Sequence, residues 1–174
     1  MSSLRPGQSW GTEASGPPDF EVNGGDQSLA SVLGRGVVDP LVRFTAATES
    51  DLARTIGLVA GAASTGLALP LDVLEYAAEA RSGVRLPEYG GKGTPVAVNS
   101  IVVGVPPDRL RSWHRPAGLS VEIDGAAVDA AGATSLVVMN GQYLRGLDLS
   151  PRGLPGDGVA EAQLYALPPG ARRA

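Results

Sequence analysis

A glycine-rich turn followed by an acid is the first feature of this sequence that could do chemistry. Gly24-Gly25-Asp26 follows a short apolar run at 20–23 and precedes a helical pattern. Backbone N–H groups at such a turn, together with the start of a helix, can hold an anion such as a phosphate. Asp26 is then a candidate catalytic base, and the alternative is that its carboxylate only caps the helix.

A second polar cluster lies within residues 45–57, and it consists of Thr48, Glu49, Asp51 and Arg54. The spacing of Thr48 and Asp51 predicts a capping box at the start of a helix. Glu49 either defines a new site or is a first-turn carboxylate stabilised by the helix dipole. Asp51 and Arg54 either reach a cleft or act as a cap and a solvated cation.

The third segment begins at Asn140-Gly141-Gln142-Tyr143 and continues to Ser150-Pro151 and Asp157-Gly158. Arg145 is a candidate anion-binding residue, because a guanidinium pairs well with phosphate oxygens, and the alternative is an ordinary solvated arginine. Asp157 is a candidate metal ligand, and the alternative is an ordinary Asp-Gly turn.

These three segments, in this order, resemble the diacylglycerol-kinase-like lipid kinase family. Residues 24–28 are similar to its Gly-Gly-Asp-Gly-Thr phosphate loop, and residues 45–57 to its Pro-Leu-Gly-Thr-Gly-Asn-Asp-Leu-Ala-Arg run. The third segment is similar to the Asn-Gly and Asp-Gly pattern of the family's second domain. The resemblance implies a nucleotide-binding lobe, a lipid-binding lobe and Mg-ATP as the cofactor of an active kinase.

Three departures from the family pattern argue against kinase activity. Gln27 replaces a glycine in the phosphate loop, and Arg145-Gly146 stands in a shortened glycine run. Glu49 places a carboxylate where nucleotide phosphates would approach, and like charges a few Å apart repel by about 4 kcal/mol at an effective dielectric of 20. We therefore expect no bound cofactor unless the kinase interpretation holds.

The hydrophobic pattern predicts an α/β part followed by a β part. We expect a disordered arm at 1–18, a small parallel α/β nucleotide-like lobe at 19–66 and an antiparallel β-sandwich lobe at 67–174. In the first lobe, strand, helix, strand and helix should alternate between residues 20 and 57, ending at Gly57. Residues 67–76 fit either a helix or a strand.

The second lobe is predicted to consist of short strands. They are expected at 96–105, in a hairpin at 121–128 that turns at Asp124-Gly125, and at 135–139, 143–149 and 159–167. Against the lipid kinase family the chain is short at both ends, so we expect open sheet edges. A partner chain or a second copy would cover them.

Composition narrows the classes of function. The chain has no cysteine and one histidine, which excludes thiolate chemistry and histidine-rich metal clusters. The net charge of −4 disfavours non-specific nucleic-acid binding. The sequence shows no secretory signal and no uninterrupted apolar stretch long enough to span a membrane, so a cytoplasmic protein is expected.

Three functions stay open at this point. The first is a degenerate lipid-kinase-like protein without ATP-dependent activity, acting as a binding subunit with a partner chain. The second is one subunit of a heteromeric biosynthetic enzyme that acts on a phosphate- or sulfate-ester substrate in specialised metabolism. The third is an active diacylglycerol or lipid kinase. A small-molecule or lipid ligand is compatible with each.

Overall fold

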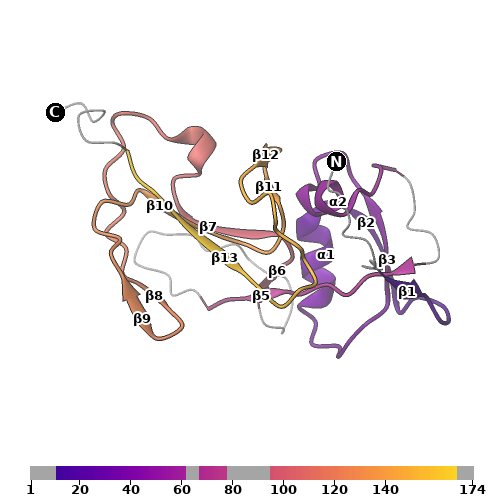
Figure 1. Cartoon of the computed structure of the whole chain (residues 1–174). Helices are drawn as coiled ribbons and strands as arrows, with labels where there is room; N and C mark the ends of the chain where they lie inside the picture. The colour runs from indigo at the N-terminus through magenta and orange to yellow at the C-terminus, as the bar shows by residue number, and fades with distance from the viewer. Residues whose placement is uncertain (1–10, 62–66, 78–94, 168–174) are drawn as a thin grey trace. The chain divides into compact units, whose positions relative to one another are not determined.

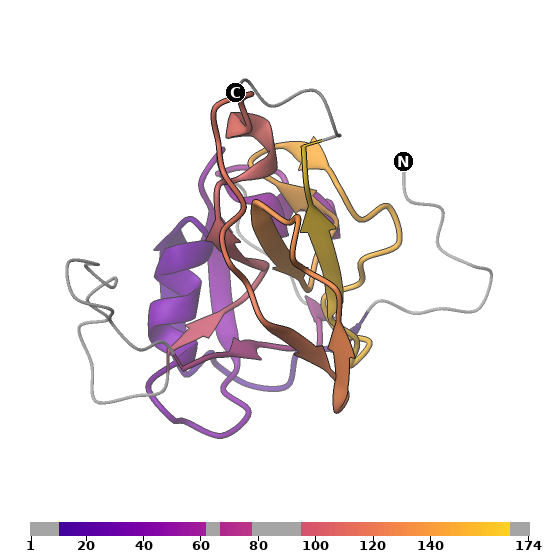
Figure 2. The same cartoon turned by 90° about the vertical axis from the view of Figure 1, so that its left-hand side faces the viewer.

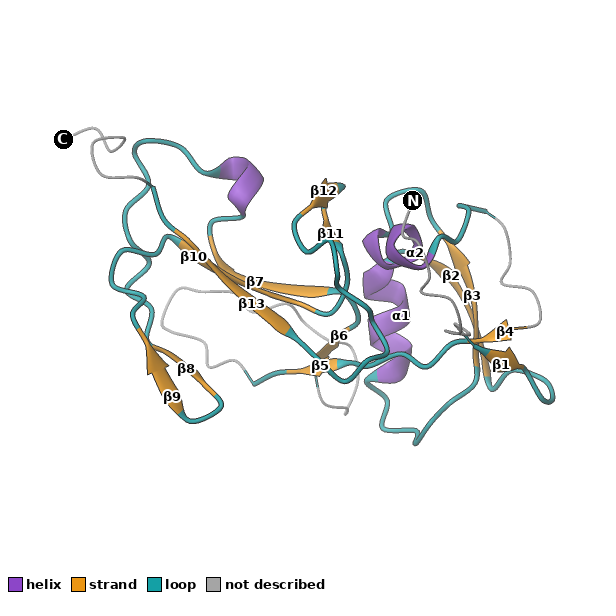
Figure 3. Cartoon of the chain, in the orientation of Figure 1, coloured by secondary structure: helices purple, strands orange, loops and turns teal. Residues whose placement is uncertain are grey.

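The computed structural model describes residues 11–61, 67–77 and 95–167. Within them the fold is mixed, with many short strands in several small sheets and few helices (Figure 1, Figure 3). The chain forms two compact units, one from Met1–Asn99 with Asn140–Val159 and one from Ser100–Met139 with Ala160–Ala174. The predicted boundary after residue 66 adjoins residues 62–66, which lie outside the described part, and it stays a prediction.

The first unit contains the predicted strand–helix–strand–helix order. Strand β2 (Phe20–Gly24) leads into α1 (Asp26–Leu33), and β3 (Val42–Ala46) leads into α2 (Asp51–Ile56). The two strands pair in parallel, as expected when a helix connects them. This part of the prediction is confirmed.

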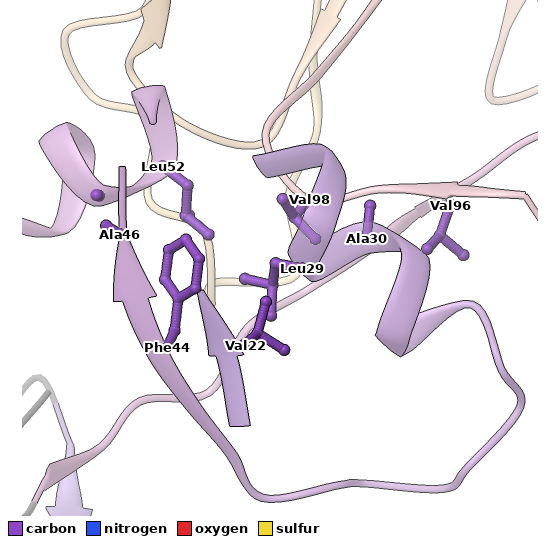
Figure 4. Packing of buried hydrophobic residues seen from close by; sticks show 9 residues of the cluster. Val22, Leu29, Ala30, Phe44, Ala46, Leu52, Val96 and Val98 are labelled. Carbon is purple, nitrogen blue, oxygen red and sulfur yellow. The ribbon is translucent and has the colours of Figure 1, made fainter. Parts of the chain in front are cut away.

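Alternation along the two strands builds the core of this unit. Val22 and Phe44 lie opposite each other in register, and both are buried. Figure 4 shows them beside Leu29 of α1 and Leu52 of α2, which are also buried. The apolar face of each element is thus covered by another, which is the main source of stability for such short elements.

The cap of α2 differs from the prediction. The helix begins at Asp51, and the side chain of Ser50 accepts a hydrogen bond from the Ala53 N–H at 3.0 Å. Thr48 is exposed in the preceding loop, so it is not the capping residue. The helix ends as predicted at Gly57, whose φ of 75° lies in the left-handed region.

Residues 67–76 form neither the single helix nor the single strand considered from the sequence. Strand β4 (Leu67–Ala68) pairs with β1 (Thr12–Glu13), and β5 (Leu74–Glu75) pairs with β6 (Val96–Ala97). Pro70 lies between the two short strands and removes a backbone donor. Part of the predicted N-terminal arm is therefore paired in the structure, while residues 1–10 lie outside the described residues.

The predicted strand at 143–149 is wrong, because the segment turns back on itself. It forms a hairpin of β11 (Tyr143–Leu144) and β12 (Leu147–Asp148). The two turn residues, Arg145 and Gly146, have φ of 51° and 79°. Positive φ at both central residues is the geometry of the two-residue turns that match the twist of paired strands.

The second unit has a three-stranded antiparallel sheet in the order β13-β10-β7 (Glu161–Tyr165, Ser135–Met139, Ser100–Gly104). The yellow β13 runs beside the orange β10 in Figure 2. The predicted hairpin is confirmed as β8 (Val121–Ile123) and β9 (Ala126–Val128). The predicted run at 96–105 is instead split into β6 and β7, and a short 3-10 helix (Pro107–Arg109) follows β7. None of the described helices is long and apolar enough to cross a membrane.

Candidate functional site

The two glycines of the Gly-Gly-Asp turn have different roles. Gly24 has φ of 144°, and a Cβ at this position would lie 2.5 Å from Ser28 Oγ and 3.0 Å from Ser28 Cβ. Gly25 is the N-cap of α1 with φ of −93°, and a Cβ there would meet nothing within 4 Å. The tight geometry at Gly24 therefore brings α1 close to β2, whereas Gly25 has open space beside it.

Asp26 connects the starts of the two helices. It is the first residue of α1, and its carboxylate accepts hydrogen bonds from Ser50 Oγ at 2.5 Å and from the Leu52 N–H at 3.2 Å. Ser50 is itself the cap of α2, so one carboxylate holds the N-terminal turn of that helix. The simple interpretation of Asp26 as a cap of its own helix is wrong, because the side chain bonds to α2 instead.

Burial raises the pKa of Asp26 above the ordinary value of 3.8. The hydrogen bonds from Ser50 and Leu52 act in the opposite direction but are outweighed, and the neighbouring charge of Asp51 raises the pKa further. The carboxyl group therefore gains a proton more readily in the folded protein than in the unfolded chain.

This shift predicts a measurable pH dependence of stability. Below pH 3.8 the group is protonated in both states; above it, the folded state binds more protons, so the free energy of unfolding falls as pH rises through the folded pKa. In the Asp26→Asn variant this loss is absent. Urea unfolding of both proteins across acidic pH should show the variant gaining relative to wild type as pH rises. If the free energies of unfolding of the two proteins changed in parallel with pH, or if wild type gained relative to the variant, the raised pKa of Asp26 would be contradicted.

Asp51 holds the turn between β11 and β12. Its carboxylate accepts hydrogen bonds from the N–H groups of Arg145 and Gly146, the second at 2.9 Å. Asp51 is 8% exposed, so these bonds are shielded from water. The second and third segments of the sequence thus meet here, although 94 residues separate Asp51 from Arg145.

Two polar residues that the sequence did not single out extend this network. Thr55 Oγ1 donates to the Asp51 carbonyl at 3.0 Å and accepts from the Gln142 N–H at 3.1 Å. Asn99 Nδ2 donates to the Tyr143 carbonyl at 2.8 Å. Thr55 and Asn99 are buried, and nothing in their local sequence distinguishes them from ordinary helix and loop residues.

Asn140 and Asp72 form the far end of the same network. Asn140 Nδ2 donates to the Asp72 carbonyl at 2.6 Å, and the Asp72 carboxylate accepts from the Gly158 N–H at 2.6 Å. Asp157, the candidate metal ligand, is exposed and accepts from the Val159 N–H at 3.0 Å, as an Asp in a turn does. Among residues 11–61, 67–77 and 95–167, no group of three or more His, Asp or Glu could hold a metal ion.

Arg54 lies against the hairpin rather than over an open cleft. Its guanidinium carbon is 5.5 Å from the centre of the Tyr143 ring, within the range of a cation–π contact. A Cβ on Gly146 would come within 2.7 Å of the guanidinium, so the glycine leaves room for it. Thr48 and Glu49 are exposed in the loop before α2.

A groove in the first unit lies apart from these residues. This groove of about 1170 Å³, here called the β3 groove, is lined mainly by apolar side chains, among them Leu29, Leu33, Phe44, Leu52, Ile56 and Leu71. None of the predicted anion-binding residues lines it. The polar network and the groove are therefore separate features of the first unit.

The polar network positions backbone, and its two central acids both have hydrogen-bond partners within the protein. Asp26 and Asp51 each accept two hydrogen bonds from within the protein. Comparisons of the chain with protein-family models, with curated proteins and with solved structures find no match in any of the three. The function must therefore be argued from these residues.

Proposed function

We propose that this chain is a degenerate lipid-kinase-like protein that binds a partner chain and does not transfer phosphate from ATP. In this proposal, the first compact unit derives from a nucleotide-binding lobe and the second from a β-sandwich lobe. The order of β2, the Gly-Gly-Asp turn and α1 supports the first assignment. The antiparallel strands of the second unit are compatible with the other.

The observation that carries the proposal is the use of both acids within the protein. Mg²⁺ in phosphoryl-transfer sites is usually held by one or two carboxylates together with the substrate phosphates. The Asp51 carboxylate instead accepts two turn N–H groups, and the Asp26 carboxylate accepts from Ser50 and Leu52. Neither acid is arranged to receive a metal–nucleotide complex.

Glu49 strengthens the argument from charge. It is exposed in the loop that precedes α2. In the same loop the Ala47 N–H donates to the Gly24 carbonyl at 2.7 Å, so this loop lies beside the Gly-Gly-Asp turn. A nucleoside triphosphate that approached this turn would meet the negative charge of the Glu49 carboxylate. Binding of Mg-ATP is therefore disfavoured before any chemistry begins.

Calorimetric titration of the full chain with Mg-ATP, followed by a phosphate-transfer assay on diacylglycerol vesicles, tests the proposal. We expect neither saturable heat nor labelled lipid. The isosteric Glu49→Gln variant is the matched control, because a gain in its affinity over wild type measures the repulsion by this carboxylate alone. Phosphate transfer by the wild-type chain would contradict the proposal and restore the active lipid kinase.

A further inference from the structure

The β3 groove follows the outer edge of a sheet. Val42, Arg43 and Phe44, which are consecutive in β3, all line it, and no residue of β2 does. Because successive strand residues point to opposite faces, a groove that contacts all three lies along the edge of the strand. Its volume of about 1170 Å³ exceeds the ~300–1,000 Å³ usual for small-molecule pockets.

The backbone of β3 presents hydrogen-bonding groups to this groove. In a parallel pair, alternate residues turn their N–H and C=O toward the neighbouring strand. The Ala47 N–H donates to the Gly24 carbonyl, so the odd-numbered residues of β3 face β2. The N–H and C=O groups of Val42 and Phe44 therefore point outward, and no group within the described residues bonds to them.

These outward groups identify the chemistry of the occupant. Phe44 is only 6% exposed, and an unpaired backbone group at a buried residue costs free energy comparable to a lost hydrogen bond. The outward carbonyl of Ala46 already accepts from the Gly61 N–H at 2.9 Å, so the free outward groups are those of Val42 and Phe44. An acyl chain could fill the apolar walls but could not pair with these donors and acceptors. An extended polypeptide strand satisfies both the walls and these groups.

The printed sequence outside the described residues has no apolar run of the kind that buried strands usually carry. Residues 1–10, 62–66, 78–94 and 168–174 contain no three consecutive apolar side chains larger than alanine. Buried parallel strands are usually continuous runs of such residues. The absence of such a run from these segments favours a segment of another polypeptide as the occupant.

The charged residues that line the groove favour particular residues at the two ends of the bound segment. Asp39 and Glu75 line the groove, and the positive charge of Arg43 is paired with Glu21 at 2.8 Å. We propose that the β3 groove binds an extended apolar strand of a partner protein that carries Lys or Arg at its ends. This deepens the proposed function, because it rests on the chain acting as a binding subunit and names the chemistry of its partner.

The test uses the full chain and a labelled peptide, acetyl-Lys-Val-Ile-Val-Thr-Val-Lys-amide, in a fluorescence anisotropy titration. We expect saturable binding that weakens about tenfold when alternate peptide amides are N-methylated, since each lost backbone hydrogen bond has a modest net effect. A peptide with Glu at both ends should also bind more weakly. Equal binding of the parent and N-methylated peptides would overturn the proposal, as would no binding of the parent.

Two proline variants locate the binding edge. Val42→Pro removes the outward N–H of β3 and should weaken binding of the parent peptide about tenfold, whereas Asn23→Pro makes the matching change at the outer edge of β2 and should leave it unchanged. Equal effects of the two variants would overturn the assignment to β3. If Val42→Pro does not fold, the N-methylated peptide decides the question with the wild-type chain. The Mg-ATP titration tests the proposed loss of kinase activity independently. Failure of the peptide-binding proposal and failure of the proposed function can therefore be told apart.

Discussion

Replacing Asp51 with alanine is expected to lower the free energy of unfolding by about 2–4 kcal/mol. The reason is that the carboxylate accepts two backbone N–H groups from the Arg145-Gly146 turn in a site with little water. Hydrogen bonds to a charged acceptor are stronger than neutral ones, and both donors lose their partner at once. Urea unfolding followed by circular dichroism measures the loss.

Glu49→Ala is the matched control for this variant. It removes a carboxylate two residues away in the sequence, but Glu49 is exposed, so the change should stay within about 0.5–1 kcal/mol. Hydrogen exchange adds a local measurement, because the amides of Arg145 and Gly146 should lose protection in the Asp51→Ala variant alone. Unchanged protection of both amides would show that Asp51 does not hold the turn.

The part of the fold that could be predicted from the sequence is the part with local signals. The apolar run before Gly24, the helical spacing after Asp26 and the left-handed stop at Gly57 depend on neighbouring residues only. The same holds for the hairpin with its Asp124-Gly125 turn, where both residues have positive φ. Such features are set by backbone sterics, which a short window of sequence contains.

The features that could not be predicted depend on partners far away in the chain. The segment 143–149 has the composition of one strand, and it folds into a hairpin because Asp51, far away in the sequence, binds the N–H groups of its turn. Thr55 and Asn99 bond to the same segment and look unremarkable in their own neighbourhoods. Ser50, not Thr48, caps the helix, and its hydroxyl also donates a hydrogen bond to Asp26 from the other helix.

The candidate site shows the same division. The sequence drew attention to Gly24, Asp26, Asp51 and Arg145. In the structure Asp26 accepts from the Ser50 hydroxyl at the start of α2, and Asp51, the first residue of that helix, accepts from the Arg145 N–H. What these residues do there could not be read from their types, because a carboxylate that receives a ligand and one that receives two backbone amides look alike in sequence.

The Gly24→Ala variant distinguishes a glycine-rich turn that holds a phosphate from one that only allows close packing. With φ of 144° and Ser28 Cβ 3.0 Å from the new methyl group, the variant should lose about 2–4 kcal/mol of unfolding free energy. Gly25→Ala is the matched control, because its Cβ would enter open space at an ordinary φ and the gain in unfolded-state rigidity is the same for both variants. It should change stability by less than about 1 kcal/mol.

The comparison also bears on function, since a loop that holds phosphate needs close approach of the ligand along its whole backbone. The chain has both glycines, but packing of β2 against α1 requires glycine only at position 24, where a side chain has no room. Urea unfolding of the two variants measures the difference directly. If Gly25→Ala lost as much unfolding free energy as Gly24→Ala, the turn would be under a constraint other than the contact between β2 and α1. An anion held by the backbone amides of the turn would then be the next candidate to test.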